Sequence, residues 1–283
     1  MNKEEIMENI CVCGYGSIGK KHGNALKQLG YDFDIIDVQY ESTGSYDKEY
    51  DLVLICTPTA YHISEAKKFI NTKSFLIEKS FDSDLEKVIK AKSFFEDKDV
   101  YVGYNLRYTD FYRELDNCLF EYDGYVKFIN VFYSGNLLNW RPGVDPKECY
   151  SYNKNLGGGI IADVSHEFDY IYNILGKPNK SQFISRRVSG ITIDCDDYCV
   201  AIWEYDNFIV KFELKTFSKP ERYCEVLIRD SHEKLYEFKY KIDDLDIFGS
   251  YYFQLKAILN RSVKPQNYDD IITFNKLIME GKI

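Results

Sequence analysis

Short apolar runs alternate with segments of helical spacing over the first 105 residues of the chain. The apolar runs predict strands at residues 9–13, 33–37, 52–56, 74–77 and 100–103. Segments with apolar residues at helical spacing predict helices at residues 17–29, 60–70 and 84–95. Strands that alternate with helices indicate right-handed crossovers and a parallel sheet covered by helices on both faces.

The pattern changes after residue 120. Further strands are expected at residues 125–134 and as two hairpins at residues 198–215 and 223–240, within a strand-rich region from 182 to 241. Helices are expected at residues 157–176, 251–259 and 268–280. The chain is therefore predicted to be an α/β protein. A doubly wound parallel sheet should occupy residues 1–120, and an α+β domain with a large, mostly antiparallel sheet should occupy residues 121–283.

Three glycines at the spacing G-x-G-x-x-G follow the first predicted strand and open the first helix. Gly14 permits a tight turn, Gly16 lets the backbone approach a pyrophosphate, and Gly19 lets the helix pack close to its strand. The helix N-terminus adds free N–H groups and a partial positive charge. This context favours a dinucleotide-binding turn. The turn residues expected to contact the cofactor are Gly14, Tyr15, Gly16, Ser17, Ile18 and Gly19.

An acidic residue ends the second predicted strand, as a dinucleotide site requires. Asp37 lies 18 residues after Gly19, and its carboxylate can accept hydrogen bonds from both hydroxyls of the adenosine ribose. The same charge would repel a 2′-phosphate, and residues 38–40 include no arginine to compensate. The sequence therefore predicts NAD rather than NADP as the cofactor.

Composition and charge exclude several other classes of protein. The net charge of -9 and the absence of a basic stripe argue against a nucleic-acid partner. The first ten residues lack the apolar core of a signal peptide, and the longest apolar runs are too short to span a bilayer. We therefore expect a cytoplasmic protein with no membrane partner. The eight cysteines follow neither a disulfide nor a zinc pattern, so reduced thiols and metal-free chemistry are expected.

Several motifs, in order along nearly the whole chain, resemble those of the Gfo/Idh/MocA oxidoreductases, the family of glucose-fructose oxidoreductase and inositol dehydrogenase. These motifs are GYGSIGKKH (14–22), CTPTAYH (56–62), IEKS (77–80), GYNLRY (103–108) and GGGIIADVSHEFD (157–169). The resemblance implies an N-terminal Rossmann domain and a C-terminal domain whose open sheet often forms the subunit interface. It also implies an active site between the two domains. The implied reaction is reversible hydride transfer between nicotinamide and a carbinol carbon of a sugar, cyclitol or related compound.

The resemblance implies further cofactor contacts after the third, fourth and fifth strands. These residues are Cys56, Thr57, Pro58, Thr59, His62, Glu78, Lys79 and Asn105. For His62, contact with the cofactor and a role in helix capping or packing both remain open.

IEKS is similar to the E-K-P motif of the family, in which the lysine touches both nicotinamide and substrate. Carried over, Lys79 would bind the reacting hydroxyl and stabilise negative charge on its oxygen. The alternative is an ordinary surface lysine. Ser80 replaces the family's proline, which removes a fixed φ angle next to the lysine.

Asp163 and His166 are three residues apart, so they are expected on one face of the helix predicted at 157–176. A histidine exchanges protons near neutral pH, and a carboxylate beside it can orient the ring and raise its pKa. In the common family pattern the histidine is four residues after the aspartate, where this chain has Glu167. A branch of the family reads D-x-x-H-E-x-D-Y, which the chain matches through Tyr170. His166 and Glu167 thus compete for the acid/base role, and we favour His166.

Other side chains are expected to bind the substrate. Arg107 is a candidate for a substrate hydroxyl or carboxylate, and Trp140 and Arg141 lie in a loop expected to face the substrate. A tryptophan face suits a sugar ring, although a packed Trp–Arg pair is an equal alternative. The residues expected at the substrate are Lys79, Arg107, Trp140, Arg141, Asp163, His166 and Glu167.

The leading hypothesis is an NAD-dependent dehydrogenase or reductase that acts on a sugar or nucleotide-sugar. The D-x-x-H-E branch resembles family members of bacterial surface-sugar biosynthesis. One alternative is a glycoside-cleaving enzyme that oxidises its substrate transiently, and another is a non-catalytic NAD-binding sensor.

The second-domain sheet is also expected to mediate self-association. Val200, Ile202 and Tyr205 are expected on one face and Ala201 and Trp203 on the other, so both faces should carry apolar residues. Helices of one domain can cover only one of these faces, which predicts a homodimer or homotetramer.

Overall fold

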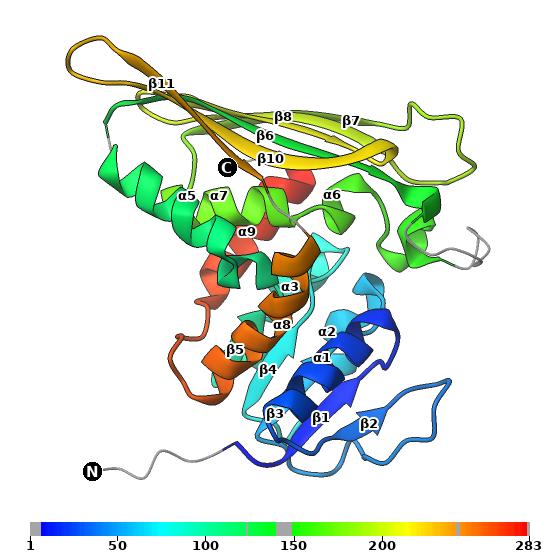
Figure 1. The fold of residues 1–283 in the computed structure, drawn as a ribbon. Coiled ribbons are helices and arrows are strands. Elements are labelled where there is room, and N and C mark those ends of the chain that lie inside the picture. The colour runs from blue at the N-terminus through cyan, green and yellow to red at the C-terminus, as the bar shows by residue number, and fades with distance from the viewer. Residues whose placement is uncertain (1–6, 123, 140–148, 242–243, 282–283) are drawn as a thin grey trace, which may run out of the picture. The chain divides into compact units, whose positions relative to one another are not determined.

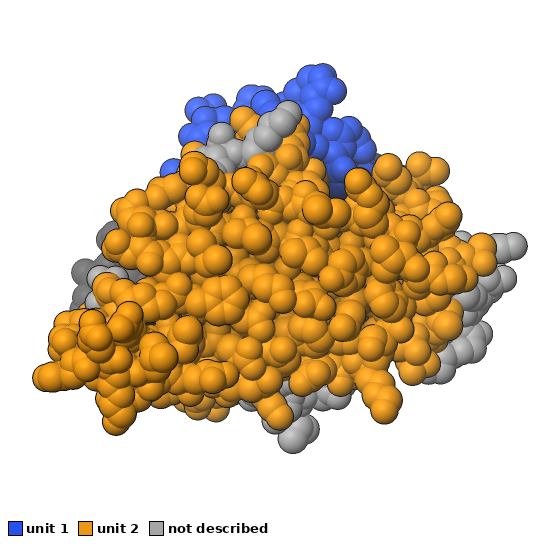
Figure 2. Space-filling view, turned by 90° about the horizontal axis from the view of Figure 1, so that it is seen from above, with its two compact units in different colours: residues 1–108, 248–272 blue, residues 109–247, 273–283 orange. Residues whose placement is uncertain are grey.

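The computed structural model describes residues 7–122, 124–139, 149–241 and 244–281 of the 283-residue chain. It divides into two compact units, which Figure 2 distinguishes by colour. Unit 1 contains residues 1–108 and 248–272, and unit 2 contains residues 109–247 and 273–283. Among the helices of the described segments, none combines the length and the apolarity that crossing a bilayer requires.

Unit 1 is built on a parallel five-stranded sheet with the strand order β2-β1-β3-β4-β5. The strands are β1 (Ile10–Cys13), β2 (Asp34–Ile36), β3 (Leu52–Ile55), β4 (Ser74–Ile77) and β5 (Asp99–Val102). Every residue of β1, β3 and β4 is buried, as expected for strands covered on both faces. The predicted doubly wound parallel sheet is confirmed.

The helices of unit 1 are shorter or more divided than the sequence pattern predicts. They are α1 (Ser17–Gln28), α2 (His62–Ala66), α3 (Leu85–Lys90), α4 (Lys92–Phe95) and the 3₁₀ helices η1 (Thr59–Tyr61) and η2 (Asn105–Tyr108). The helix expected at 84–95 is divided at Ala91 into α3 and α4. Asp84 caps α3, because its carboxylate accepts the N–H groups of Glu86 and Lys87.

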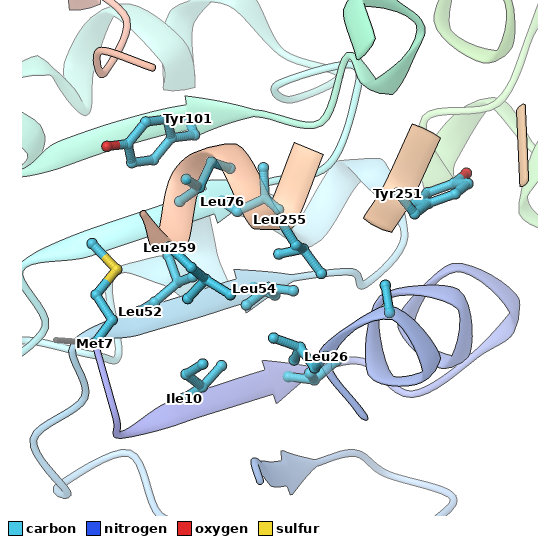
Figure 3. Packing of buried hydrophobic residues seen from close by; sticks show 13 residues of the cluster. Met7, Ile10, Leu26, Leu52, Leu54, Leu76, Tyr101, Tyr251, Leu255 and Leu259 are labelled. Atoms are coloured by element: carbon cyan, nitrogen blue, oxygen red, sulfur yellow. The ribbon is translucent and has the colours of Figure 1, made fainter. Parts of the chain in front are cut away.

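A helix from the C-terminal part of the sequence completes the core of unit 1. Figure 3 shows side chains of α8 (Asp244–Leu259) packed together with those of β1, β3 and β4. Leu255 and Ile258 are fully buried, and Tyr251 and Leu259 are nearly so. Full burial of one such side chain stabilises a fold by about 1.5–3 kcal/mol. Residues 251–259 therefore pack in unit 1, and not in the second domain that the sequence pattern predicts for them.

The chain then continues through a last helix, α9 (Tyr268–Glu280). Its first residues also belong to unit 1, where the Tyr268 hydroxyl donates to the Val88 carbonyl at 2.9 Å.

Unit 2 contains a six-stranded sheet with the strand order β11-β10-β6-β9-β8-β7. The strands are β6 (Val126–Asn136), β7 (Lys180–Arg186), β8 (Tyr198–Glu204), β9 (Ile209–Lys215), β10 (Phe217–Arg229) and β11 (Leu235–Lys241). β6 and β9 are parallel, and the other neighbours are antiparallel. This result confirms a mostly antiparallel second sheet with hairpins at β8–β9 and β10–β11.

Helices cover one face of this sheet (Figure 1). They are α5 (Asp110–Glu121), α6 (Ile160–Asp163) and α7 (His166–Leu175). Phe168 of α7 packs on Trp203 and Phe212, with ring centroids 5.6 and 4.6 Å away. No described element of unit 2 covers the opposite face, which Figure 2 shows from outside.

The helix predicted at 157–176 is two helices, which corrects one step of the sequence analysis. α6 ends at Asp163, Val164 and Ser165 separate the helices, and α7 begins at His166. Asp163 and His166 therefore do not share one face of a continuous helix.

Candidate functional site

The three glycines of the turn after β1 have the separate roles that their spacing predicts. Gly14 has φ +89°, and a Cβ there would lie 2.7 Å from the backbone of Cys56 and Thr57. A Cβ at Gly19 would lie 2.0 Å from the Gly14 carbonyl oxygen, so α1 packs directly on the turn. A Cβ at Gly16 would meet no atom within 4 Å. The turn is thus closed on the protein side and open above Gly16, as a pyrophosphate would need.

The N-terminus of α1 is suited to an anion. Gly16 is the N-cap residue, so no side chain of the cap accepts a hydrogen bond from the first turn. The first turn contains no acidic residue either. Its N–H groups and the positive end of the helix dipole are therefore available to a phosphate.

Asp37 is fixed beside this turn at the end of β2. Its Oδ2 accepts the Tyr15 N–H at 2.6 Å, and its Oδ1 accepts the Gln39 N–H at 2.7 Å. The first bond joins the carboxylate to the glycine turn across 22 residues of sequence. A hydrogen bond thus joins Asp37 to the glycine turn, which is the arrangement that a dinucleotide site requires.

Lys79 follows β4 and is half-buried, next to a carboxylate that is not exposed. Glu78 Oε2 accepts the Lys79 N–H at 3.3 Å, and Oε1 lies 2.7 Å from Nε2 of the fully buried His22. A Cβ at Gly103 would lie 2.7 Å from Glu78 Oε1, so only glycine leaves room for this pair. Glu78 and His22 thus fix the backbone at Lys79 relative to α1, and sequence reasoning gave His22 no part in the site.

His62 connects the ends of β3 and β4. Its Nε2 lies 2.8 Å from the Thr57 carbonyl oxygen, and its Nδ1 lies 3.0 Å from the Ser80 carbonyl oxygen. The imidazole is buried, and burial lowers its pKa although the two carbonyls act in the opposite direction. This geometry supports the packing role that the sequence left open for His62.

The remaining residues after β3 and β5 also lie at the carboxyl ends of the strands. The Cys56 N–H donates to the Cys13 carbonyl at 2.7 Å, and Thr59 opens η1 in a buried position. The amide of buried Asn105 donates to the Ser250 hydroxyl of α8 at 2.6 Å. The Arg107 guanidinium lies 5.6 Å from the Tyr104 ring centroid. Unit 1 therefore brings the predicted cofactor residues to one edge of its sheet.

In unit 2, close packing explains the three glycines before α6. Gly157 and Gly159 have φ +84° and +123°. A Cβ at Gly158 would lie 2.2 Å from the Tyr150 carbonyl oxygen. The Ile160 N–H donates to the Asp196 carbonyl at 2.9 Å, which holds the start of α6 against the loop before β8.

Asp163 and His166 lie on either side of the break between α6 and α7. Asp163 Oδ1 accepts the Ser151 hydroxyl at 3.2 Å, and its Oδ2 accepts the Gly159 N–H at 3.4 Å. His166 is partly exposed at the first position of α7. A fixed carboxylate and a partly exposed imidazole are groups suited to proton transfer.

Glu167 is committed to an internal ion pair. Its side chain is fully buried, and Oε1 accepts Nε–H of Arg222 on β10. Burial acts to lower the pKa of Arg222, but the charge and the hydrogen bond of Glu167, together with Tyr133 and Tyr170, raise the pKa above its usual value. The Arg222 guanidinium also lies 5.4 Å from the Tyr133 ring centroid. Sequence reasoning missed Arg222, because nothing in the strand pattern connects it with a residue 55 positions earlier.

Two predicted substrate residues, Trp140 and Arg141, lie outside the described residues. Across the residues that the structure describes, no three side chains of histidine, cysteine, aspartate or glutamate come together as a metal site would require.

Solved structures with this fold match nearly the whole chain. GenD2 from gentamicin A biosynthesis, solved in complex with NAD, is 16% identical with a TM-score of 0.73, over 98% of this chain and 93% of GenD2. The myo-inositol 2-dehydrogenase from Lactobacillus plantarum is 14% identical with a TM-score of 0.72, over 97% and 96% of the two chains. An oxidoreductase from Thermotoga maritima is 14% identical with a TM-score of 0.75, over 96% and 95%. No family model and no curated protein matches the sequence. The chain therefore shares with these oxidoreductases a fold that combines a parallel sheet with a mostly antiparallel one, as the motif resemblance implied.

Proposed function

We propose that the chain is an NAD-dependent oxidoreductase that transfers a hydride between nicotinamide and a carbinol or carbonyl carbon of a sugar or sugar derivative. The observation that carries this proposal is the glycine turn, closed behind Gly14 and Gly19, open above Gly16 and joined to the Asp37 carboxylate. GenD2, which has the same fold, was solved with NAD, and another protein of this fold is a myo-inositol dehydrogenase.

Unit 1 binds the cofactor in this proposal. Residues 14–19 bind the pyrophosphate through the N-terminus of α1, and the Asp37 carboxylate accepts hydrogen bonds from the ribose hydroxyls. The residues at the carboxyl ends of β3 and β4 form the nicotinamide side. Bound NAD supplies the hydride chemistry.

Lys79 and His166 handle the reacting oxygen. The Lys79 ammonium donates a hydrogen bond to the substrate oxygen and stabilises negative charge that develops there. His166 removes the hydroxyl proton in oxidation and returns it in reduction, while Asp163 orients it. Arg107 is proposed to bind a polar group elsewhere on the substrate. The burial and ion pair of Glu167 support His166 as the proton carrier.

The reaction is tested by mixing purified protein with NAD or NADH and a panel of sugars, cyclitols and nucleotide-sugars. Reduced nicotinamide is followed by its absorbance. Net consumption of cofactor with at least one sugar supports a dehydrogenase. Glycoside cleavage without net consumption supports the transient-oxidation alternative instead. Surface-sugar biosynthesis is the proposed role if nucleotide-sugars are the preferred substrates.

We predict that the protein binds NAD more tightly than NADP, because the Asp37 carboxylate would face a 2′-phosphate of the same charge. A repulsion of only about 1.4 kcal/mol gives a tenfold preference. Isothermal titration calorimetry with both cofactors measures the ratio. Tighter binding of NADP by the unmodified protein would contradict the assignment of Asp37.

We also propose self-association through the uncovered face of the unit 2 sheet, as a homodimer or homotetramer. Ala201 and Trp203 are buried beneath the helices, whereas Val200 and Ile202 point to the other face. Exposed Ile184 pairs with Val200, so the apolar surface continues onto β7. Tyr205 does not extend this surface, because its hydroxyl donates to the Gly176 carbonyl at 3.0 Å.

Replacing Ile202 with Glu is expected to shift the protein toward monomer, because it places charge within the proposed interface. Ile89→Glu is a matched control, since Ile89 is 48% exposed and lies on α3 of unit 1 rather than on the unit 2 sheet. Light scattering at micromolar concentration gives the mass of each variant. A monomeric unmodified protein would refute the proposal.

The proposed location is the cytoplasm, where NAD-dependent reactions and reduced thiols are both common. All eight cysteines are unpaired, and seven of them are buried. Unpaired cysteines in this number are usual in a reducing compartment.

A further inference from the structure

A lysine on the first turn of α1 lies beside the glycine turn. Lys20 extends from the first turn of α1, and its Nζ lies 2.6 Å from the Tyr40 hydroxyl and 4.9 Å from the Tyr40 ring centroid. Within the described ranges of the chain, Lys20 forms no ion pair. Its ammonium is thus held by a neutral hydroxyl, and the Asp37 carboxylate acts on its charge from beyond ion-pair distance.

Lys20 belongs to the same group of contacts as Asp37. The Tyr40 ring packs edge-on against the Tyr15 ring, with centroids 5.7 Å apart. The Tyr15 N–H in turn donates to Asp37. Tyr40 follows Asp37 by only three residues. Its hydrogen bond to Lys20 therefore holds the ammonium near the end of β2. The loop after β2 therefore carries a negative charge for the ribose hydroxyls and a positive charge from α1.

We propose that Lys20 is a second determinant of cofactor choice, and that its ammonium binds a 2′-phosphate at the adenosine end. This inference rests on the proposed function, since it concerns the same dinucleotide site. A 2′-phosphate is a dianion near neutral pH, so Asp37 repels it and Lys20 attracts it. The preference of the protein for NAD over NADP is then smaller than the repulsion by Asp37 alone would produce. Without Asp37, the attraction by Lys20 determines the preference.

The sequence pattern does not point to this residue, because a compensating cation is expected directly after Asp37 and residues 38–40 contain none. The cation comes instead from α1, 17 positions before Asp37 in the sequence. Tyr40 is the connection, and its hydroxyl is the only hydrogen-bond partner of Lys20 Nζ within the described chain.

The test compares NAD and NADP binding by calorimetry in the unmodified full-length protein and in Asp37→Ser, Lys20→Met and the double variant. Asp37→Ser is expected to bind NADP more tightly than the unmodified protein does. Adding Lys20→Met should weaken NADP binding by about tenfold, as expected for loss of a charge-assisted hydrogen bond, and change NAD binding less than twofold. The tenfold effect should shrink as salt is raised.

Lys27→Met in the Asp37→Ser background is the matched control. Lys27 is an exposed lysine in the last turn of the same helix, near the Phe33 ring, and its loss should leave both affinities unchanged. Thermal melting verifies that each variant is folded.

Three results would overturn the inference, and they are distinguishable. If the double variant binds NADP as well as Asp37→Ser does, while NAD still binds, Lys20 has no role and the proposed function stands. If Lys20→Met weakens the binding of NAD and NADP equally, Lys20 acts on a group that both cofactors share and not on the 2′-phosphate. If the unmodified protein binds neither dinucleotide, the proposed function fails and this inference fails with it.

Discussion

Replacing Lys79 with Met or His166 with Asn is expected to lower kcat by about 10²–10⁴-fold, the usual contribution of a positioned acid/base group. Neither residue belongs to the glycine turn or to the end of β2, so NAD affinity should change little. In the proposed reaction, the two residues act on one oxygen and one proton. The double variant should therefore lose less than the product of the two single losses. Steady-state kinetics with the substrate found by the sugar screen, together with NAD calorimetry, measures both effects.

Matched variants separate catalysis from a general loss of charge. Lys73→Met removes an exposed lysine before β4, and His232→Asn removes an exposed histidine from the β10–β11 turn. Both should keep kcat near that of the unmodified protein. If Lys79→Met also keeps full turnover, the assignment of Lys79 is wrong. If Glu167→Gln abolishes turnover in a folded protein while His166→Asn stays active, the proton belongs to Glu167.

Replacing Arg222 with Met is expected to lower the free energy of unfolding by about 3–5 kcal/mol, because it leaves the buried Glu167 carboxylate without a counter-charge. Glu167 is fully buried, so water cannot replace the lost partner. Urea denaturation of the unmodified protein and the variant measures the difference. The double variant Arg222→Met/Glu167→Gln should recover part of the loss, because no uncompensated charge then remains.

Arg229→Met is the control for this prediction. Arg229 lies on the same strand and pairs with Glu233 at 3.0 Å, but its side chain is 48% exposed. An exposed ion pair contributes about 0–1 kcal/mol, so its loss should be small. Equal losses for Arg222→Met and Arg229→Met would show that the buried pair is not a special source of stability.

The strands and the glycine turn were predictable because their signals are local. Strand β4 matches its predicted range of residues 74–77, and β1 and β3 match to within one residue. Apolar runs bounded by turn residues suffice for such elements. The spacing likewise predicts that Gly14 and Gly19 pack closely against backbone atoms, and that Gly16 borders open space. Both kinds of signal lie within about ten residues of sequence.

The parts that sequence reasoning missed depend on distant contacts. The periodicity of α8 shows an apolar helix but not which of the two sheets it covers. The break between α6 and α7 follows no proline, and packing of residues 157–160 against distant loops accompanies it. Likewise, the pattern of β10 gave no sign that Arg222 would meet Glu167. Local patterns therefore identified the elements, and long-range packing decided their neighbours.

The packing of α8 in unit 1 has a consequence for how the chain folds during synthesis. The ribosome completes β1–β5 before residue 105, but Leu255 and Ile258 of their core follow about 150 residues later. The whole sheet of unit 2 is made in the interval. A nascent chain that has emerged only through residue 247 therefore carries an N-terminal half with exposed apolar surface, of the kind that chaperones bind. Domains usually fold in the order in which they are made, whereas here the first domain to begin is completed only after the sheet of the second has been synthesised.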